Sequence, residues 1–541
     1  MTATQHSQKP SDSLSPEGML GISPTIMNLL FWGGIIFIGL LAPLVAYVLL
    51  PAFGIHTLEY LFSIKKMGAM VTLGLGGVVY LYYLSYILPR PHLLVFFNMI
   101  LWLLVEYCSE LLLINAGVNL HLRPILFLAM GAPSLWILLK HWTVLFKQIP
   151  HFKYYLLFFT WVTAYFFFYN SNASDAWGAN SDTLTGGSVA IIQMEAYFYC
   201  FVAIPIAAIG ILKHKEPFRW FDTLNKALMV ITSLVALAVI AGYPSGLYSM
   251  NLDGFTRAFG LFSHPNPYSH HMGLLLVYLL GLFFYYQSNP SKTIPKWLLL
   301  GSLAVNFIAF ILGFSKTGIG VFLLCALMMS LMSGSLQNVS KQLINILLLT
   351  ILVVPLGIFL FEILSGQSFW EMLEARINDR KSFNWRTEVW GYLLAQIEGF
   401  WILVGHGFTA GNVTVFQFTY NNASNAKPLI MVHNGYIALL YDFGIMGYSL
   451  FAAAVSVGLH GMKTFLTSTS NTAVKIASRP LSVAMIALTV YYLVVCYFDE
   501  MTYMFDAARL YWLFATTLLS LTVVHHQSNS KNAPLAETQH S

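Results

Sequence analysis

Long apolar stretches separated by short polar connections run along most of the chain. Each is about as long as the roughly 20 residues that a helix needs to cross a bilayer. Lipid offers backbone groups no hydrogen-bond partners, so each such stretch is expected to be a helix. The pattern predicts about fourteen spanning helices. They are expected at residues 27–50, 68–88, 93–115, 122–140, 154–170, 188–212, 227–243, 270–287, 297–314, 318–333, 342–364, 434–460, 481–498 and 507–525.

The distribution of lysine and arginine predicts an orientation. With the N-terminus in the cytoplasm, most of these residues outside the longest loop fall on the inner side, as the positive-inside rule requires. Lys65 and Lys66 in the first hairpin run against this assignment. The predicted organisation is a polar cytoplasmic tail, a first set of spans, an outer loop domain, a second set of spans and a polar cytoplasmic tail, at residues 1–24, 25–364, 365–432, 433–525 and 526–541.

The outer loop at 365–432 is far longer than a simple connection. Loops beyond roughly 12–15 residues are usually functional or disordered. Apolar residues recur at three- and four-residue steps in two parts of it, which predicts helices at 370–380 and 384–398. We therefore expect a folded cap on the outer membrane face.

Composition supports a membrane protein and excludes other classes. Hydrophobic residues make up 57% of the 541 residues and charged residues only 9%, against roughly 25% charged in soluble domains. A soluble or disordered protein is thereby excluded. The net charge of +5 is spread thinly, which argues against a nucleic-acid partner. The four cysteines lie in apolar stretches without metal-ligand spacing and are interpreted as buried thiols.

Candidate chemistry gathers at four places on the predicted outer face. Three contain a cation and the fourth a histidine. They are Thr256–Pro267 with Arg257, Phe314–Gly318 with Lys316, Asn384–Trp390 with Arg386, and His433–Tyr436.

These residue types fit a glycosyl transfer from a lipid pyrophosphate. Arginine and lysine hold anionic phosphate groups at the interface, and histidine can deprotonate an acceptor hydroxyl near neutral pH. The cations would replace a divalent ion, so no metal or other cofactor is expected. The catalytic candidates are His433, Arg386 and Lys316, and the substrate-binding candidates are Arg257, Asn266 and Asn434.

Each candidate also has a structural interpretation. Arg257 and Lys316 could extend to lipid headgroups, and Arg386 could pair with Glu388 or Glu374. His433, Asn266 and Asn434 could cap helices. The remaining outer histidines are interpreted as structural: His264, His270, His271 and His406. Four acids lie in predicted spans, namely Glu106, Glu110, Glu195 and Asp442, and of these Asp442 could shape the site.

At the four motifs the chain resembles the O-antigen ligase and O-antigen polymerase superfamily. The resemblance covers roughly residues 240–450, and the earlier part matches only as a series of spans. The matching residues are Arg257 with Gly260, Pro265 and Asn266; Ser315 to Gly318; Arg386 with Trp390, Gly405 and Gly407; and His433 and Asn434 followed by Gly444 and Gly447.

The resemblance implies an all-α polytopic membrane protein of the GT-C type, with about 12–14 transmembrane helices and a large helical periplasmic loop. It implies a metal-independent, inverting transferase in the bacterial inner membrane, with a periplasmic site that takes a glycan from undecaprenyl pyrophosphate. Arg386 and Lys316 would hold the pyrophosphate and His433 would act as base. Lys316 occupies a position where the family often has arginine. Lysine retains the positive charge but cannot make the bidentate contact of a guanidinium.

The acceptor separates the alternatives within this superfamily. A ligase uses lipid A–core, a polymerase uses a second lipid-linked glycan, and a related branch glycosylates proteins; the ligase is slightly favoured here. The alternative from another class is a transporter or flippase for lipid-linked sugars. Transporters bind near the bilayer midplane, whereas these candidates gather at one face, which favours the enzyme.

Overall fold

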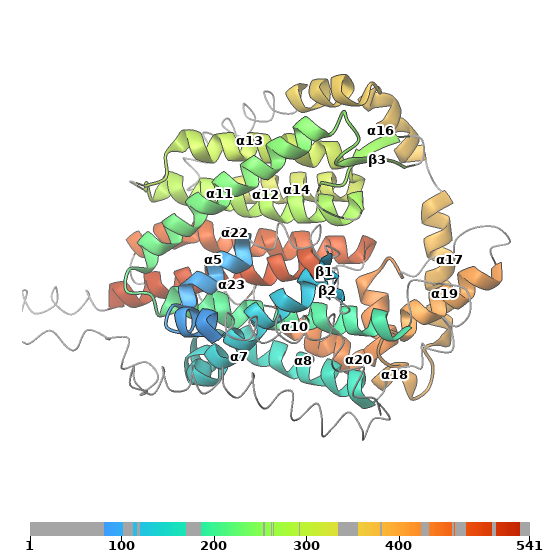
Figure 1. The fold of residues 1–541 in the computed structure, drawn as a ribbon, viewed down its shortest axis with the longest axis horizontal. Helices are drawn as coiled ribbons and strands as arrows, with labels where there is room; N and C mark the ends of the chain where they lie inside the picture. Colours follow the sequence, from blue (N-terminus) through green and yellow to red (C-terminus); the bar gives the residue numbers. More distant parts are fainter. Residues whose placement is uncertain are drawn as a thin grey trace, which may run out of the picture. The chain divides into compact units, whose positions relative to one another are not determined.

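The computed structural model describes residues 81–100, 112–115, 119–168, 186–252, 255–260, 262, 264–291, 293–333, 355–378, 381–422, 432–456, 459, 472–499 and 505–530. Helices dominate this part of the chain (Figure 1). The helices are α5 (Pro91–Ile100), α7 (Leu122–Gln148), α8 (Pro150–Phe168), α10 (Gly186–Leu212), α11 (Pro217–Gly242), α12 (Pro265–Ser288), α13 (Lys296–Gly313), α14 (Lys316–Ser333), α16 (Phe369–Asn378), α17 (Lys381–Gln396), α18 (Trp401–Val404), α19 (Ala410–Asn422), α20 (Gly435–Val455), α22 (Thr472–Phe498) and α23 (Phe505–Ser530). The strands are β1 (Leu112–Asn115), β2 (Asn119–His121), β3 (Ser249–Leu252) and β4 (Phe255–Ala258).

The chain forms two compact units. One comprises residues 1–94 and 108–136, and the other comprises residues 95–107 and 137–541. The first unit contains the antiparallel hairpin of β1 and β2. All of the candidate site residues lie in the second unit, which is described below.

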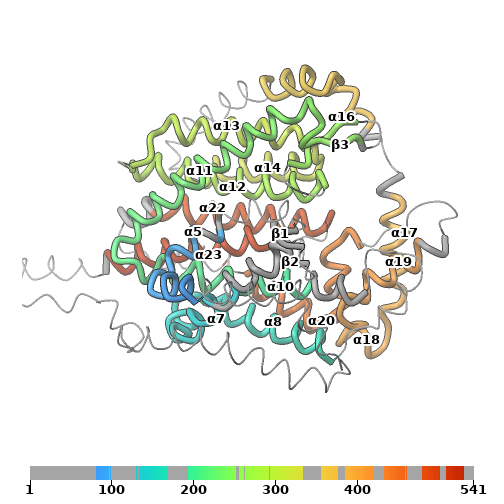
Figure 2. The backbone as a smooth tube through the Cα atoms, viewed as in Figure 1, coloured from blue at the N-terminus to red at the C-terminus, as the bar shows by residue number. Residues whose placement is uncertain are grey.

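Helix α22 is central to the second unit. It packs against α12, α14 and α23, and α23 packs in turn against α10. Figures 1 and 2 show α22 and α23 running side by side. Helices α11 and α14 lie against the α12–α13 pair, and α8 contacts both α10 and α20. The antiparallel arrangement brings the start of α12, the start of α14 and the end of α22 to one face.

Seven helices within the described ranges are long and apolar enough to cross a membrane. They correspond to predicted spans and confirm an all-α polytopic membrane protein. The predicted span at 27–50 and most of that at 68–88 lie outside the described residues. So do the two polar tails, apart from the start of the C-terminal one. The seven helices are Gln193–Leu212, Pro217–Gly242, Pro265–Ser288, Lys296–Gly313, Gly435–Val455, Ser478–Phe498 and Ala507–Ser528.

Several predicted boundaries differ from the structure, and the local sequence explains two of them. The span expected at 93–115 does not end as a helix, because Leu112–Asn115 forms β1. Asn115 and the glycine two positions later are turn formers, which favours a hairpin there. Helix α11 begins at Pro217, ten residues before the predicted 227. Its first turns are polar, so hydropathy did not include them, although proline favours the first turn of a helix.

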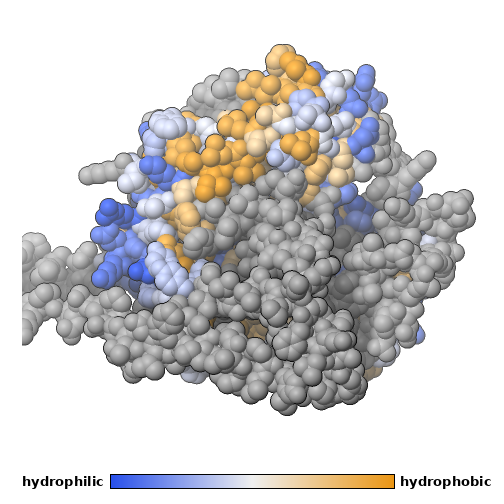
Figure 3. All heavy atoms as spheres, viewed as in Figure 1, coloured by the Kyte–Doolittle hydropathy of each residue, from blue (hydrophilic) through white to orange (hydrophobic). Residues whose placement is uncertain are grey.

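Apolar side chains remain exposed along the outside of the helices. Leu234 and Leu237 on α11 and Trp297 and Leu300 on α13 are exposed. Figure 3 shows apolar residues gathered over the region where α11 and α13 lie in Figure 1. A surface of this kind would be poorly wetted by water, and it is the surface expected against lipid.

A break in α20 connects the loop domain to the helices. Gly444 has φ 63° and ψ −172°, which interrupts the helix. The backbone N–H of His406 donates to the Tyr441 carbonyl at 2.7 Å, and that of Gly407 donates to the Asp442 carbonyl at 3.0 Å. The Asp442 carboxylate also accepts from the Gly411 N–H at 2.7 Å. The turn at 405–411 therefore satisfies polar groups that the helix itself does not satisfy.

The close approach at this break requires glycine. Gly405 has φ 77°, and a Cβ there would collide with the backbone of Phe443 and Gly444. We expect Gly405→Ala to destabilise the folded protein by about 2 kcal/mol or more, from the left-handed backbone and the collision together. Thermal unfolding of the purified protein measures this. Gly391→Ala on α17, where a Cβ meets nothing within 4 Å, is the control, and equal unfolding temperatures for the two variants would contradict the account.

Candidate functional site

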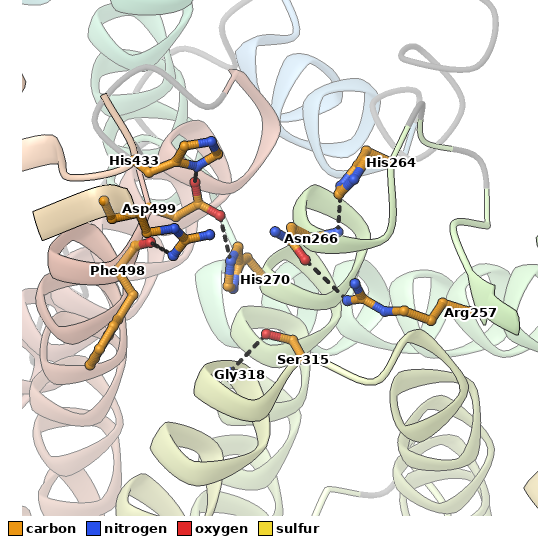
Figure 4. A network of polar contacts seen from close by, with 10 residues as sticks. Arg257, His264, Asn266, His270, Ser315, Gly318, His433, Phe498 and Asp499 are labelled. Carbon is orange, nitrogen blue, oxygen red and sulfur yellow. Dashed lines mark hydrogen bonds and ion pairs between the residues drawn. The ribbon is translucent and has the colours of Figure 1, made fainter. Parts of the chain in front are cut away.

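Helix ends from distant parts of the sequence meet at the predicted outer face. Helices α12, α14 and α20 begin there and α22 ends there, so the residues at these ends become neighbours. Figure 4 shows His433, Asp499 and His270 in one group, with Asn266 and Arg257 beside it. The dashed contacts in that view include those of Asp499 with His433 and His270 and that of Asn266 with Arg257 of β4.

Asp499 is the centre of the group and follows the last residue of α22. Its Oδ2 lies 3.2 Å from Nε2 of His270, and its Oδ1 lies 3.3 Å from Nδ1 of His433. The Asp499 and His270 side chains are each 3% exposed, whereas that of His433 is 18% exposed. His433 is thus the member of the trio that a substrate can reach.

The charge on Asp499 determines which nitrogen of His433 can act as a base. Burial raises the pKa of Asp499, but the hydrogen bonds from His270 and His433 outweigh it and hold the pKa well below its usual range. The carboxylate is therefore ionised at neutral pH and can only accept hydrogen bonds. His433 must donate from Nδ1, so in the neutral ring the lone pair lies on Nε2.

The backbone at His433 is strained and held in place by α17. His433 has φ 54°, a conformation that non-glycine residues seldom adopt and that often marks functional sites. Trp390 of α17 donates through Nε1 to the carbonyl of Val432 at 2.8 Å. The ring of Trp385 lies edge-on to the His433 ring, with centroids 6.2 Å apart. Helix α17 therefore fixes both the backbone and the ring of His433.

Arg386 lies on the same helix and contacts the residue next to Asp499. Its Nη1 donates to the carbonyl of Phe498 at 3.0 Å, and the side chain is half-buried. The carbonyl is at the C-terminus of α22, where a cation is favoured. The suggested pairing with Glu388 or Glu374 is not the contact that the structure shows. Arg386 and His433 are thus both positioned against the end of α22.

Arg257 forms a second group with Asn266. It lies on β4, opposite Met250 of β3, and is only 5% exposed. Its Nε donates to the Gly313 carbonyl at 3.1 Å, and its Nη2 donates to Oδ1 of Asn266 at 3.0 Å. These contacts join the β3–β4 hairpin to the end of α13 and the start of α12. Extension of Arg257 into the headgroups is therefore wrong, because its guanidinium is buried in the protein.

The two asparagines differ in their local roles. Asn434 caps α20, because its Oδ1 accepts from the N–H groups of Tyr436 and Ile437, each at 3.0 Å. Asn266 does not cap α12. That role falls to His264, whose Nδ1 accepts from the Asn266 N–H at 3.2 Å. The side chain of Asn266 instead holds Arg257.

Lys316 is the first residue of α14 and is exposed. The preceding turn is tight: Phe314 has φ 42°, and Ser315 Oγ accepts from the N–H of Gly318 at 3.1 Å. The carbonyl of Gly313, which Arg257 contacts, belongs to the same turn. Lys316 therefore stands at a helix N-terminus, where both its charge and the helix dipole favour an anion.

Sequence reasoning missed Asp499 altogether and interpreted His270 as structural. A signal was present, because a histidine inside an apolar span and an acid at the end of one are costly in lipid and often functional. Their partnership was not visible, since the two residues lie 229 positions apart. Among the residues that the structure describes, no His, Cys, Asp or Glu group has the arrangement of a metal site. Cys200, Cys325 and Cys496 are buried thiols, as predicted, and Cys108 lies outside these ranges.

Comparison with known proteins agrees with the motifs. The family model described as O-antigen ligase matches residues 301–452. The match contains Lys316, Arg386 and His433, the three catalytic candidates, whereas His270 and Asp499 lie beyond it. No curated protein matches the chain. The match supports a multi-pass membrane protein of the ligase and polymerase class, with a glycosyltransferase-like activity. Residues 301–452 of the chain are therefore similar to the O-antigen ligase family.

Proposed function

We propose that the protein transfers a glycan from undecaprenyl pyrophosphate to an acceptor hydroxyl at the periplasmic face of the bacterial inner membrane. The observation that carries this proposal is the contact of His433 and His270 with one buried, ionised Asp499. It supplies a histidine with a defined tautomer at the helix ends where the cations gather. The family match supports the same class of reaction.

His433 acts as the general base. Its Nε2 takes the proton from the acceptor hydroxyl while that oxygen forms a bond to the anomeric carbon of the glycan. The bond from the anomeric carbon to the pyrophosphate oxygen breaks, and its electron pair leaves with undecaprenyl pyrophosphate. Asp499 is a positioning residue, because it orients the ring and stabilises the imidazolium that forms. Attack opposite the leaving group inverts the anomeric centre.

The positive groups around His433 stabilise the leaving pyrophosphate. Arg386 and Lys316 supply full charges. The starts of α12, α14 and α20 add partial positive charge from their backbone N–H groups. Arg257 contributes through the turn at Gly313, which it holds in place. In this proposal the cations and helix N-termini take the part of a divalent ion.

The acceptor is proposed to be the lipid A–core, as in a ligase, with a polymerase as the second candidate. A host strain that lacks this chain tests both on a gel of its surface glycans. If the protein is a ligase, the lipid A–core carries no polymer while long lipid-linked chains persist. If it is a polymerase, only a single-repeat rung remains. Unchanged glycan would contradict both, and lipid-linked glycan trapped at the cytoplasmic face would indicate a transporter.

Arg386 is expected to act mainly in binding the donor. Arg386→Lys retains the charge but loses the planar guanidinium, so it cannot contact Phe498 and a phosphate group together. Loss of a charged hydrogen bond predicts a rise in donor KM of about tenfold or more. Steady-state kinetics with the purified protein measures it. The control is Arg219→Lys, an exposed arginine paired with Glu216, and a donor KM that is equally changed in both variants would refute the assignment.

A further inference from the structure

The loop domain carries a short apolar segment that the transfer mechanism does not use. Phe400 and the first three residues of α18, Trp401, Ile402 and Leu403, are four consecutive large apolar residues, and all are exposed. Helix α18 has no buried residue. Four exposed apolar side chains in a row would be costly to leave in water. Among the described residues nothing covers this segment, so we infer that it faces an apolar environment.

Neighbouring contacts place this segment against α8 and against α20, one of the seven candidate membrane-spanning helices. Tyr165 of α8 donates its hydroxyl to the Val404 carbonyl. The turn that follows α18 donates from His406 to the Tyr441 carbonyl of α20, and α18 itself packs on α20. Helix α18 is thus attached to the sides of two packed helices rather than held above them.

Exposed apolar residues also lie on α8, close in sequence to Tyr165, which contacts α18. Phe167 and Phe168, at the end of α8, are exposed as well. The segment just before α18 is polar, because Gln396 and Glu398 lie there. Apolar and aromatic side chains beside a polar border are the pattern of an element in the membrane interface.

We propose that Phe400–Leu403 inserts into the outer leaflet of the bilayer and contacts lipid acyl chains. The expected depth is about 5–10 Å below the headgroup boundary. A protein partner would leave the exposed apolar end of α8 unexplained. Because α17 and α18 are separated by only a short connection, this insertion sets the height of α17 above the membrane. This inference does not depend on glycan transfer.

A spin label at Ile402 tests the insertion. The full chain, with its four cysteines replaced by alanine, receives a single cysteine through Ile402→Cys and is reconstituted into phosphatidylethanolamine–phosphatidylglycerol vesicles. Collision of the nitroxide with oxygen, which partitions into lipid, is compared with collision with a water-soluble nickel chelate. Leu234→Cys, on the lipid-facing side of α11, and Gln417→Cys, an exposed polar position of α19, are the two references.

Insertion predicts that the Ile402 label collides with oxygen in preference to nickel, as at Leu234, but at a shallower depth. A label that collides with nickel as readily as that at Gln417 would overturn the proposal. An immobile label that is reached by neither reagent would also overturn it, in favour of a protein contact. Leu403→Cys is measured in parallel, so that one poorly folded variant does not decide the outcome.

Discussion

The His433→Ala variant is expected to lose glycan transfer by about 10²–10⁴-fold, the usual contribution of a general base. The loss follows because no other histidine in the described part of the site shares both the partial exposure of His433 and its contact with Asp499. The rate of glycan transfer, measured on membranes that contain equal amounts of each protein, tests this. Lipid-linked glycan should accumulate as the surface product disappears.

A histidine at the opposite end of the helices provides the matched control. His214 lies in the connection between α10 and α11 and accepts a hydrogen bond from the Glu216 N–H. His214→Ala should retain normal transfer. If His433→Ala retained it as well, at normal protein levels, the base would have to be another residue.

The Asp499→Asn variant is expected to lower kcat by about 10²–10⁴-fold while leaving the donor KM nearly unchanged. Asparagine matches the shape of the carboxylate, but it lacks the charge that stabilises a protonated His433. Its amide can also donate to Nδ1, which would move the ring proton to Nε2 and remove the base. Steady-state kinetics of the purified variant separates the two parameters.

Asp222→Asn is the control for this variant. Asp222 accepts hydrogen bonds from Tyr286, Ser291 and Thr293 but lies far along the chain from the site. Its variant should keep both kinetic parameters. A rise in donor KM without a fall in kcat for Asp499→Asn would contradict the role of Asp499 in orienting the base. It would point instead to a part in donor binding.

The membrane helices could be predicted because lipid imposes a simple rule. An apolar run of sufficient length must be a helix, so α12, α13 and α20 lie close to where the pattern expects them. Three cations and one histidine could be placed at one face by counting helices. Their contacts could not be predicted in this way. The partner of Arg386, the carbonyl of Phe498, is close only because of the tertiary fold.

The tertiary contacts of the site could not be predicted from the sequence pattern, because they join residues that are distant in sequence. His270 and His433 meet at Asp499 because α12, α20 and α22 pack together. Asn266 shows the same limit on a smaller scale. Its position at the start of α12 suggests a cap, yet His264 takes that role and Asn266 instead contacts Arg257. Residue type suggests the chemistry that we propose for the site, whereas helix packing determines which residues lie together there.

The most direct measurement is a transfer reaction with the purified protein in lipid nanodiscs. Undecaprenyl-pyrophosphate-linked glycan and lipid A–core are supplied with a chelator present, and the product is followed on a gel. The account predicts that the glycan moves to the acceptor, that undecaprenyl pyrophosphate is released, and that His433→Ala forms neither product. Equal transfer by His433→Ala and the unaltered protein would contradict the central role of His433.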